Sequence, residues 1–240
     1  MNRRARLGRV WERVTIGQSG AAVSRRAGVY RKTSDVEDLV GEGERLVWLR
    51  VQGIPAAEVL ECEPGLLVTA EVPGRSAAEP WPDPDRIVDS LADFTRALHA
   101  LPVADCPFDR SLAVTVPEAL AADPDLDDLD DERAGWTRDR LVAELLATRP
   151  ADEDLVVCHG DLSVPNVLFD PETGDVTGVV DAGRLGVADR WLDLAIATRS
   201  LVDERNSQYG PDAAARYLER CGTEPDPAKT AFYRLLDEFF

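Results

Sequence analysis

The chain has 240 residues, 44% of them apolar, so it can fold around one large core or two smaller ones. Its 45 acidic and 27 basic residues give a net charge of −18, which would repel nucleic acid and anionic membranes and attract a cationic small molecule. The four cysteines form no CxxC pair, no apolar run reaches the roughly 18 residues of a membrane span, and the N-terminus lacks the apolar core of a signal peptide. We therefore expect neither a zinc knuckle nor a membrane helix, and we expect a cytoplasmic location.

Residues 1 to about 72 predict a small β-rich lobe. Residues 14–34 alternate as two short strands around a glycine-containing turn, with a second break at Arg26–Gly28. Two further strands are predicted within 53–62 and 65–75, where apolar runs are bounded by glycine and proline.

One helix is predicted inside this lobe, over residues 35–52. Asp35 is a candidate N-cap, because a carboxylate at that position can accept hydrogen bonds from the first-turn N–H groups. The apolar spacing predicts one buried face, made by Leu39, Leu46, Val47 and Val51.

The rest of the chain predicts a mostly helical lobe. A stretch rich in proline and small residues at 76–85 has the composition of a linker. Residues 121–132 hold seven carboxylates, which form either a solvated loop or one wall of a cleft for a cation. The predicted elements are helices at 86–101 and 137–149, a hairpin at 169–181, and helical structure from Trp191 to the C-terminus.

The stretch VVCHGDLSVPNVLFD, from Val156 to Asp170, places polar residues between two apolar segments. It holds the carboxylate of Asp161 and, five residues later, the amide of Asn166; a second carboxylate, Asp181, follows the predicted hairpin. In phosphoryl transfer a carboxylate can orient and deprotonate the attacking hydroxyl, and Mg²⁺ takes hard oxygen ligands. The pattern therefore favours Asp161 as the base, with Asn166 and Asp181 as metal ligands. His159 would brace this loop, and His99 would be structural.

The β-rich lobe supplies a candidate phosphate-binding lysine. Lys32 lies in the apolar segment VYRKT, and Glu42 lies in the helix that follows. A strand lysine held by a helix glutamate is the kinase arrangement for contacting phosphates. The turn IGQSGAAV would let Ser19 and nearby amides touch phosphate oxygens, and the chain has no GxxxxGK[ST] loop.

The chain resembles the aminoglycoside phosphotransferases, most closely the 3′-phosphotransferases that act on kanamycin and neomycin. The resemblance covers nearly the whole chain, and it implies a protein-kinase-like, two-lobed α+β fold. Residues 1–72 would form the nucleotide-binding lobe, and residues 73–240 the catalytic and substrate-binding lobe. The matching stretches are GEGERLVWL, VTAEVPGR, CPFDRSLAVTVPEA, TRPADEDLVVCHGDLSVPNVLFDP, VTGVVDAGRLGVADRW and AFYRLLDEFF.

The resemblance also implies roles for individual residues. Lys32, with Glu42 as its partner, would contact the α- and β-phosphates of ATP, and Arg184 would lie near the reacting centre beside Asp161. The other expected nucleotide contacts are Ser19, Tyr30, Glu71 and Val72. The expected antibiotic ligands are Asp203, Glu204, Asp237, Glu238 and the terminal carboxylate of Phe240.

The resulting hypothesis is a monomeric enzyme that uses ATP and Mg²⁺ to phosphorylate an aminoglycoside, giving antibiotic resistance. The 3′-hydroxyl is the expected acceptor. The alternatives are a streptomycin 3″-kinase, a kinase for a small alcohol such as choline, and a non-catalytic nucleotide- or drug-binding protein. A metal hydrolase using His159, Asp161 and Asp181 is a further alternative.

Overall fold

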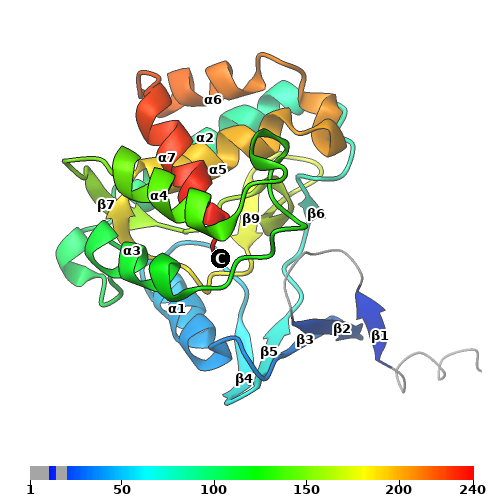
Figure 1. Cartoon of the computed structure of the whole chain (residues 1–240). Helices are drawn as coiled ribbons and strands as arrows, with labels where there is room; N and C mark the ends of the chain where they lie inside the picture. Colours follow the sequence, from blue (N-terminus) through cyan, green and yellow to red (C-terminus); the bar gives the residue numbers. More distant parts are fainter. Residues whose placement is uncertain (1–10, 15–20) are drawn as a thin grey trace, which may run out of the picture. The chain divides into compact units, whose positions relative to one another are not determined.

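The computed structural model describes residues 11–14 and 21–240. The chain forms two compact units, and each unit is assembled from two segments (Figure 1). The first unit comprises Met1–Ser76 and Asn166–Gly183. The second unit comprises Ala77–Pro165 and Arg184–Phe240.

The first unit is built on an antiparallel sheet of five strands in the order β1-β2-β3-β5-β4. Helix α1 packs against β4 and β5. Within the sheet, β3 pairs with β5 so that Lys32 lies opposite Leu67, a buried residue. The elements are β1 Glu12–Val14, β2 Ala22–Arg26, β3 Val29–Thr33, α1 Leu39–Val51, β4 Val59–Glu63 and β5 Leu66–Ala70.

Helix α1 begins later than the sequence predicts. The Ser34 hydroxyl accepts hydrogen bonds from the backbone N–H groups of Val36 and Glu37, which holds residues 34–37 in a turn outside the helix. Asp38, and not Asp35, is the N-cap, because its carboxylate accepts the Gly41 N–H at 2.9 Å.

The buried face of α1 also differs from the predicted one. Leu39 and Leu46 are buried as expected, but Val47 is 49% exposed and Val51 is 76% exposed. The helix instead packs through residues that follow the 3.6-residue period from Leu39. Three of the buried residues are not large apolar residues, so the apolar pattern does not mark them. The buried residues of α1 are Leu39, Gly41, Glu42, Gly43, Leu46 and Leu49.

The predicted hairpin forms and belongs to the first unit. Strands β8 (Val167–Phe169) and β9 (Val176–Val179) pair antiparallel, and β6 (Arg75–Ser76) pairs with β8. Ala56 bridges to Val179, which connects the hairpin to the segment before β4. This grouping differs from the predicted division at residue 72, which assigned the hairpin to the larger lobe; the lobe boundaries stay a prediction.

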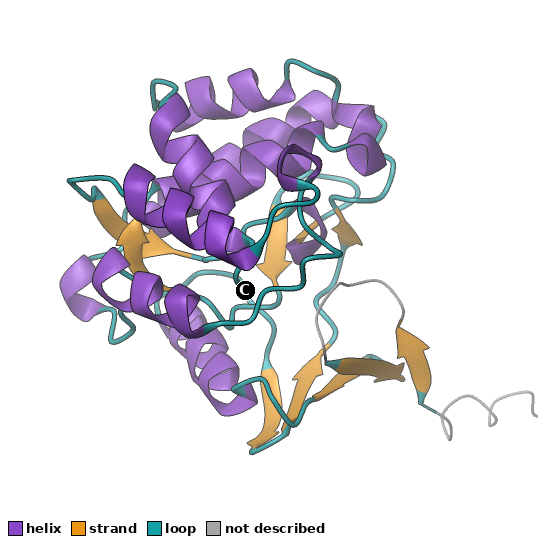
Figure 2. Cartoon of the chain, in the orientation of Figure 1, coloured by secondary structure: helices purple, strands orange, loops and turns teal. Residues whose placement is uncertain are grey.

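Helices make up most of the second unit (Figure 2). Helix α5 is largely buried and packs against α6 and α7, while α2 packs against α6. Strand β7 pairs antiparallel with β10. The helices and strands are α2 Pro84–His99, α3 Leu112–Ala121, α4 Arg138–Thr148, β7 Leu155–Cys158, β10 Gly186–Asp189, α5 Trp191–Val202, α6 Ala213–Cys221 and α7 Pro227–Asp237. The 3₁₀ segments are η1 Val103–Asp105, η2 Asp131–Arg133, η3 Val164–Asn166, whose last residue belongs to the first unit, and the six-residue η4 Glu204–Tyr209.

The predicted linker, residues 76–85, is anchored to the second unit at two buried residues, Ala77 and Trp81. Trp81 is buried and donates its backbone N–H to the Gln208 side chain in η4. The Tyr209 hydroxyl donates to the Ala77 carbonyl oxygen. Within residues 11–14 and 21–240, no helix has both the length and the apolar character needed to cross a membrane. The element content confirms the predicted α+β class.

Candidate active site

Three carboxylates surround the Lys32 ammonium group in the first unit. Its Nζ lies 2.9 Å from Glu42 Oε2 in α1, 2.9 Å from Asp181 Oδ1 and 2.8 Å from Glu37 Oε2. The Lys32 side chain is 13% exposed and the Glu42 side chain 6%. We call these four residues the lysine cluster. The sequence predicts the pairing of Lys32 with Glu42, and the structure shows it.

The charges of the lysine cluster depend on one another. Burial is the largest influence on the pKa of Lys32 and lowers it, but attraction to Asp181 and Glu42 outweighs burial and leaves the pKa above its ordinary value. Lys32 therefore carries a full positive charge at neutral pH. Burial raises the pKa of Glu42 more than the neighbouring Lys32 lowers it.

Asp181 adopts a backbone conformation that is uncommon for a residue with a side chain. Its φ of 59° lies in the left-handed region, which aspartate tolerates better than most residues but still at a cost in free energy. The backbone N–H of Val180, the residue before Asp181, donates to the Asn166 carbonyl oxygen at 3.0 Å. This hydrogen bond fixes the backbone that leads into Asp181. A carboxylate and an amide oxygen on this hairpin are hard donors of the kind that Mg²⁺ prefers, so these residues fit the metal.

The expected adenine contacts lie in β3 and directly after β5 of the same unit. Tyr30 in β3 is opposite Thr69 in β5, and the Glu71 backbone N–H donates to the Gly28 carbonyl oxygen at 2.9 Å. Val72 is buried, whereas Glu71 is exposed. Ser19 lies outside the described residues.

We call His159–Asp161 the HGD segment; it follows β7 in the second unit. His159 is fully buried, and its Nδ1 accepts the backbone N–H of Asp161 at 3.3 Å, which agrees with the predicted bracing role. Gly160 has a φ of 88°, and a side chain there would bring its Cβ within 2.6 Å of the Arg184 carbonyl carbon. Glycine is therefore required where the HGD segment passes the backbone of Arg184. Asp161 itself is half-buried.

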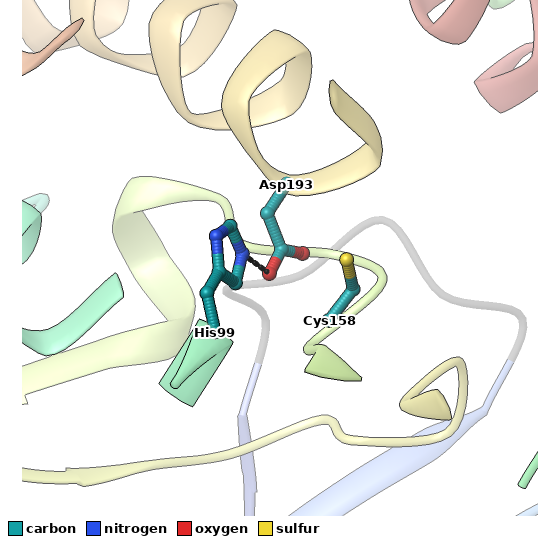
Figure 3. A group of neighbouring side chains, drawn as sticks. All are labelled: His99, Cys158 and Asp193. Atoms are coloured by element: carbon teal, nitrogen blue, oxygen red, sulfur yellow. Dashed lines mark hydrogen bonds and ion pairs between the residues drawn. The ribbon is translucent and has the colours of Figure 1, made fainter. Parts of the chain in front are cut away.

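The HGD segment is also bonded to α5 through Asp193, which has no exposed surface. Asp193 Oδ2 accepts the His159 backbone N–H and Oδ1 accepts the Gly160 N–H, both at 2.9 Å. His99, the last residue of α2, contacts the same carboxylate (Figure 3).

Asp237, an expected antibiotic ligand, already pairs with two arginines. Arg184 Nη1 lies 2.6 Å from Asp237 Oδ1, and Arg199 Nη2 contacts Asp237 Oδ2. Burial raises the pKa of Asp237, but the two guanidinium groups outweigh it and hold the pKa below the ordinary value. A cavity of about 10 Å³ lies beside this pair, lined in part by Gly160, Arg184, Asp237 and Phe240.

Glu238 is held by the segment that the sequence marked as acidic. Arg133 Nη1 lies 3.1 Å from Glu238 Oε1, and the Asp130 backbone N–H donates to Glu238 Oε2 at 3.2 Å. The Asp130 carboxylate in turn accepts Arg199 Nη1 at 2.8 Å. Burial and the nearby Asp130 raise the pKa of Glu238. We call this set the C-terminal ion network; its members are Asp130, Arg133, Arg184, Arg199, Asp237 and Glu238.

The other expected antibiotic ligands are less enclosed. Asp203 caps η4 by accepting the Arg205 backbone N–H, and its carboxylate pairs with the Arg205 side chain at 2.7 Å. Glu204 is exposed, and Phe240 is 45% exposed. The Phe240 ring lies beneath Arg110 and Arg184, at 5.3 and 5.9 Å from ring centroid to guanidinium carbon.

Several residues of these clusters were not predicted from sequence. Glu37, Arg133, Arg199 and Asp193 have no local motif, because their partners lie far along the chain or across a turn. The acidic segment gave one usable signal: Asp130 and Arg133 are an oppositely charged pair three residues apart.

The first unit has a lysine–glutamate pair joined to a hairpin aspartate, and the second unit has an HGD loop; each of these is a feature of phosphotransferases. Residues 8–233 match the phosphotransferase enzyme family (APH), and the chain belongs to that family. The predicted family and enzyme class are thereby confirmed.

Three individual relatives show how similar this chain is to particular members of the family. An aminoglycoside 3′-phosphotransferase from Streptomyces fradiae is 49% identical over 96% of this chain and 95% of its own length. A solved aminoglycoside-3′-phosphotransferase of type VIII superposes with a TM-score of 0.87 at 47% identity, covering 96% of this chain and 94% of that one. A complex of the phosphotransferase APH(3″)-Id from Streptomyces rimosus with ADP and streptomycin has a TM-score of 0.79 at 33% identity, over 95% and 92% of the two chains. These structures confirm the predicted kinase-like fold.

Proposed function

We propose that this chain is an aminoglycoside 3′-phosphotransferase, which transfers the γ-phosphoryl group of ATP to the 3′-hydroxyl of a kanamycin- or neomycin-type drug and so gives antibiotic resistance. The observation that carries the proposal is the lysine cluster, because it presents a charged lysine held by a helix glutamate and a hairpin aspartate. The choice of the 3′-hydroxyl rests on relatives that are 47% to 49% identical and carry that name. The proposal includes a monomer that works in the cytoplasm, where ATP is available.

The first unit would bind the nucleotide. Lys32 would contact the α- and β-phosphates, and Glu42 would orient it. Tyr30 would stack on adenine, Glu71 and Val72 would lie along its edge, and Ser19 would approach the phosphates. Asn166 and Asp181 would hold Mg²⁺, which when bound neutralises charge on the phosphates.

The second unit would carry the acceptor chemistry. Asp161 would accept a hydrogen bond from the drug hydroxyl, orient it for in-line attack and take its proton. Arg184 would stabilise charge on the transferred group. His159 keeps Asp161 in place through its backbone contact and takes no part in proton transfer.

The drug would bind through carboxylates near the C-terminus. Asp237, Glu238 and the terminal carboxylate of Phe240 would pair with its ammonium groups, with Asp203 and Glu204 as outer contacts. In the structure Asp237 and Glu238 are paired with arginines. The ammonium groups of a drug would therefore exchange with, or add to, these arginine contacts.

A panel assay with purified protein, ATP and Mg²⁺ tests the proposal. We expect kanamycin and neomycin to be phosphorylated, streptomycin and choline to react weakly or not at all, and the phosphate to be found on the 3′ position by NMR. An analogue that lacks the 3′-hydroxyl is the matched control, and we expect it to bind and inhibit without being consumed. Faster turnover of streptomycin with 3″ product would replace the proposal by the 3″-kinase alternative.

A further inference from the structure

Asp193 is a buried carboxylate with three nitrogen partners that come from two other parts of the second unit. Two are the backbone N–H groups of His159 and Gly160, and the third is His99 Nε2, which lies 3.0 Å from Asp193 Oδ2 (Figure 3). Asp193 has no exposed surface, and the His99 side chain is 10% exposed. A buried carboxylate is costly unless its oxygens are hydrogen-bonded, so each of these contacts matters for its position.

The direction of the His99 contact follows from the chemistry of the pair. When Asp193 is ionised its carboxylate can only accept hydrogen bonds, and His99 Nε2 is then the donor of this contact. Oδ2 therefore receives one N–H from the HGD segment and one from α2, while Oδ1 receives the Gly160 N–H. Removing the His99 donor would leave Oδ2 with the His159 N–H as its described partner, so the carboxylate would be held by two hydrogen bonds instead of three.

A metal site is the other chemistry that these side chains suggest. Ligand atoms of His99, Cys158 and Asp193 lie within 4.8 Å of one another. However, both Asp193 oxygens already accept backbone N–H groups. Burial also raises the pKa of the Cys158 thiol well above its ordinary value, so the protonated sulfur is a poor ligand, and it lies 3.4 Å from the Asp189 carbonyl oxygen. The contacts therefore favour a hydrogen-bonded network over a metal.

We propose that His99 is a positioning residue for the HGD segment, acting through Asp193. His99 fixes the Asp193 carboxylate, the carboxylate fixes the His159–Gly160 peptide, and that peptide sets the place of Asp161, the next residue. This proposal deepens the proposed function, because it matters for turnover only if Asp161 performs the acceptor chemistry. A misplacement of about 1 Å at a reacting group can cost on the order of 100-fold in rate.

Three variants separate positioning from general packing. His99→Leu removes the donor and keeps the volume close to that of histidine, whereas His99→Gln keeps an N–H near the place of Nε2. Tyr217→Phe is the matched control, because it removes a different buried hydrogen bond of α2, the 2.8 Å contact with Thr95. If His99→Leu does not fold, His99→Asn replaces it, since its shorter amide does not reach the place of Nε2.

We expect His99→Leu to lower kcat about tenfold to 100-fold, with the KM values for ATP and kanamycin within about twofold of wild type. His99→Gln should recover most of that loss, and Tyr217→Phe should keep wild-type kcat. If His99→Leu or its Asn replacement turns over like Tyr217→Phe, or if His99→Gln is as impaired as His99→Leu, the positioning role is overturned.

Hydrogen exchange supplies a readout that needs no substrate. Backbone exchange of the peptide that contains His159 and Gly160 should be about tenfold faster in His99→Leu, near normal in His99→Gln and unchanged in Tyr217→Phe. Unaltered exchange in His99→Leu would contradict the proposal even if the protein phosphorylates no aminoglycoside. Absence of drug phosphorylation by the wild type, with the expected exchange pattern, would instead overturn the proposed function alone.

Discussion

The two units of the chain balance charge in opposite ways. In the lysine cluster, one ammonium group pairs with the three carboxylates of Glu37, Glu42 and Asp181. In the C-terminal ion network, the three carboxylates of Asp130, Asp237 and Glu238 pair with three arginines, Arg133, Arg184 and Arg199. The first group has an excess of negative charge, and the second is neutral.

This difference bears on what each group can bind. An excess of carboxylates opposes a bare polyphosphate and favours one that arrives with a divalent cation. A neutral network does not attract a cationic drug strongly, so affinity there depends on exchange of partners rather than on bare charge. The lysine cluster also has a single positively charged side chain, whereas the C-terminal ion network has three. The predictions below test these contrasts.

The largest effect is expected from a residue outside both groups. Asp161→Asn should lower kcat by about 10²-fold to 10⁴-fold, because it removes the proposed base, while both KM values change little. Steady-state kinetics with ATP and kanamycin give the measurement. Near-normal kcat at saturating substrate would show that the acceptor hydroxyl does not need this carboxylate.

Lys32→Met should be the most damaging change within the lysine cluster. It leaves the buried Glu42 beside two other carboxylates, so we expect unfolding to become easier by about 3 to 5 kcal/mol. The KM for ATP should rise about tenfold to 100-fold, since hydrogen bonds to charged groups are worth roughly 1.5 to 3 kcal/mol. Urea denaturation and ATP titrations provide both values.

Lys229→Met is the control for Lys32→Met. Lys229 lies 2.5 Å from the fully buried Asp189, so its loss should also destabilise the second unit. The KM for ATP should stay at the wild-type value. Equal effects of the two lysine variants on ATP kinetics would remove the phosphate role of Lys32.

Acid should weaken the C-terminal ion network through Asp237. Because the folded protein holds the Asp237 pKa below its unfolded value, the folded state binds fewer protons there, and the resulting stability is present above about pH 4 and lost as pH falls through the folded pKa. Asp237→Asn should therefore cost about 1.5 to 3 kcal/mol at pH 7, and less as the pH falls toward 3. Urea unfolding of both proteins at several pH values measures the gap.

Glu238→Gln provides the opposite control in the same network. The pKa of Glu238 is raised, so its ionised form is disfavoured in the folded protein and its loss should not cost more at pH 7 than at pH 3. A pH-independent gap for Asp237→Asn would mean that the arginines do not stabilise its ionised form.

Drug affinity should depend on the same two carboxylates. The double change Asp237→Asn with Glu238→Gln should raise the KM for kanamycin about tenfold and flatten its dependence on salt, because fewer charges remain to be screened. The KM for ATP should stay at the wild-type value. Asp89→Asn with Asp93→Asn is the matched control, since it neutralises two carboxylates that pair with Arg216 and Arg220 elsewhere in the unit. Wild-type affinity in the first double variant would exclude this end of the chain from drug binding.

The smallest effect is expected at Glu37. An ammonium group has three donors, and in the structure three carboxylates lie around Lys32, so a phosphate oxygen must displace one of them. Glu37→Gln should ease that exchange and lower the KM for ATP about threefold. Asp35→Asn removes the same charge from the same segment and should leave the KM unchanged. A higher KM in Glu37→Gln would show that Glu37 assists the nucleotide.

The sequence predicted the parts of the site that depend on local pattern. Lys32 in a strand, Glu42 in the next helix and the HGD loop before a hairpin are each signalled by neighbours along the chain. Asp35 was the wrong cap because Ser34 forms a turn that delays the helix, and the choice between Asp35 and Asp38 depends on that side chain. Val47 and Val51 look like core residues, but the face of α1 is set by what the sheet presents to it.

Contacts between distant segments could not be predicted from the sequence. Arg133 and Glu238 are 105 residues apart, and the arginine directly follows the acidic run 121–132, for which the sequence left a solvated loop and a cleft wall both open. His99 gave a weak signal as a histidine at the end of an apolar helix face, and its link to Asp193 joins residues 94 positions apart in the chain. Such pairs follow from the tertiary arrangement and not from the spacing of residue types.

The division of the first unit into two segments has a consequence for the order in which the chain is made. A ribosome releases the sheet and α1 first, whereas Asp181 is 149 residues beyond Lys32. Until the hairpin emerges, Lys32 must pair with Glu37 and Glu42 without Asp181, and strand β6 has no β8 to join. The sheet can form early, but the first unit is finished only after most of the second unit has already left the ribosome, so its completion is a late event in synthesis.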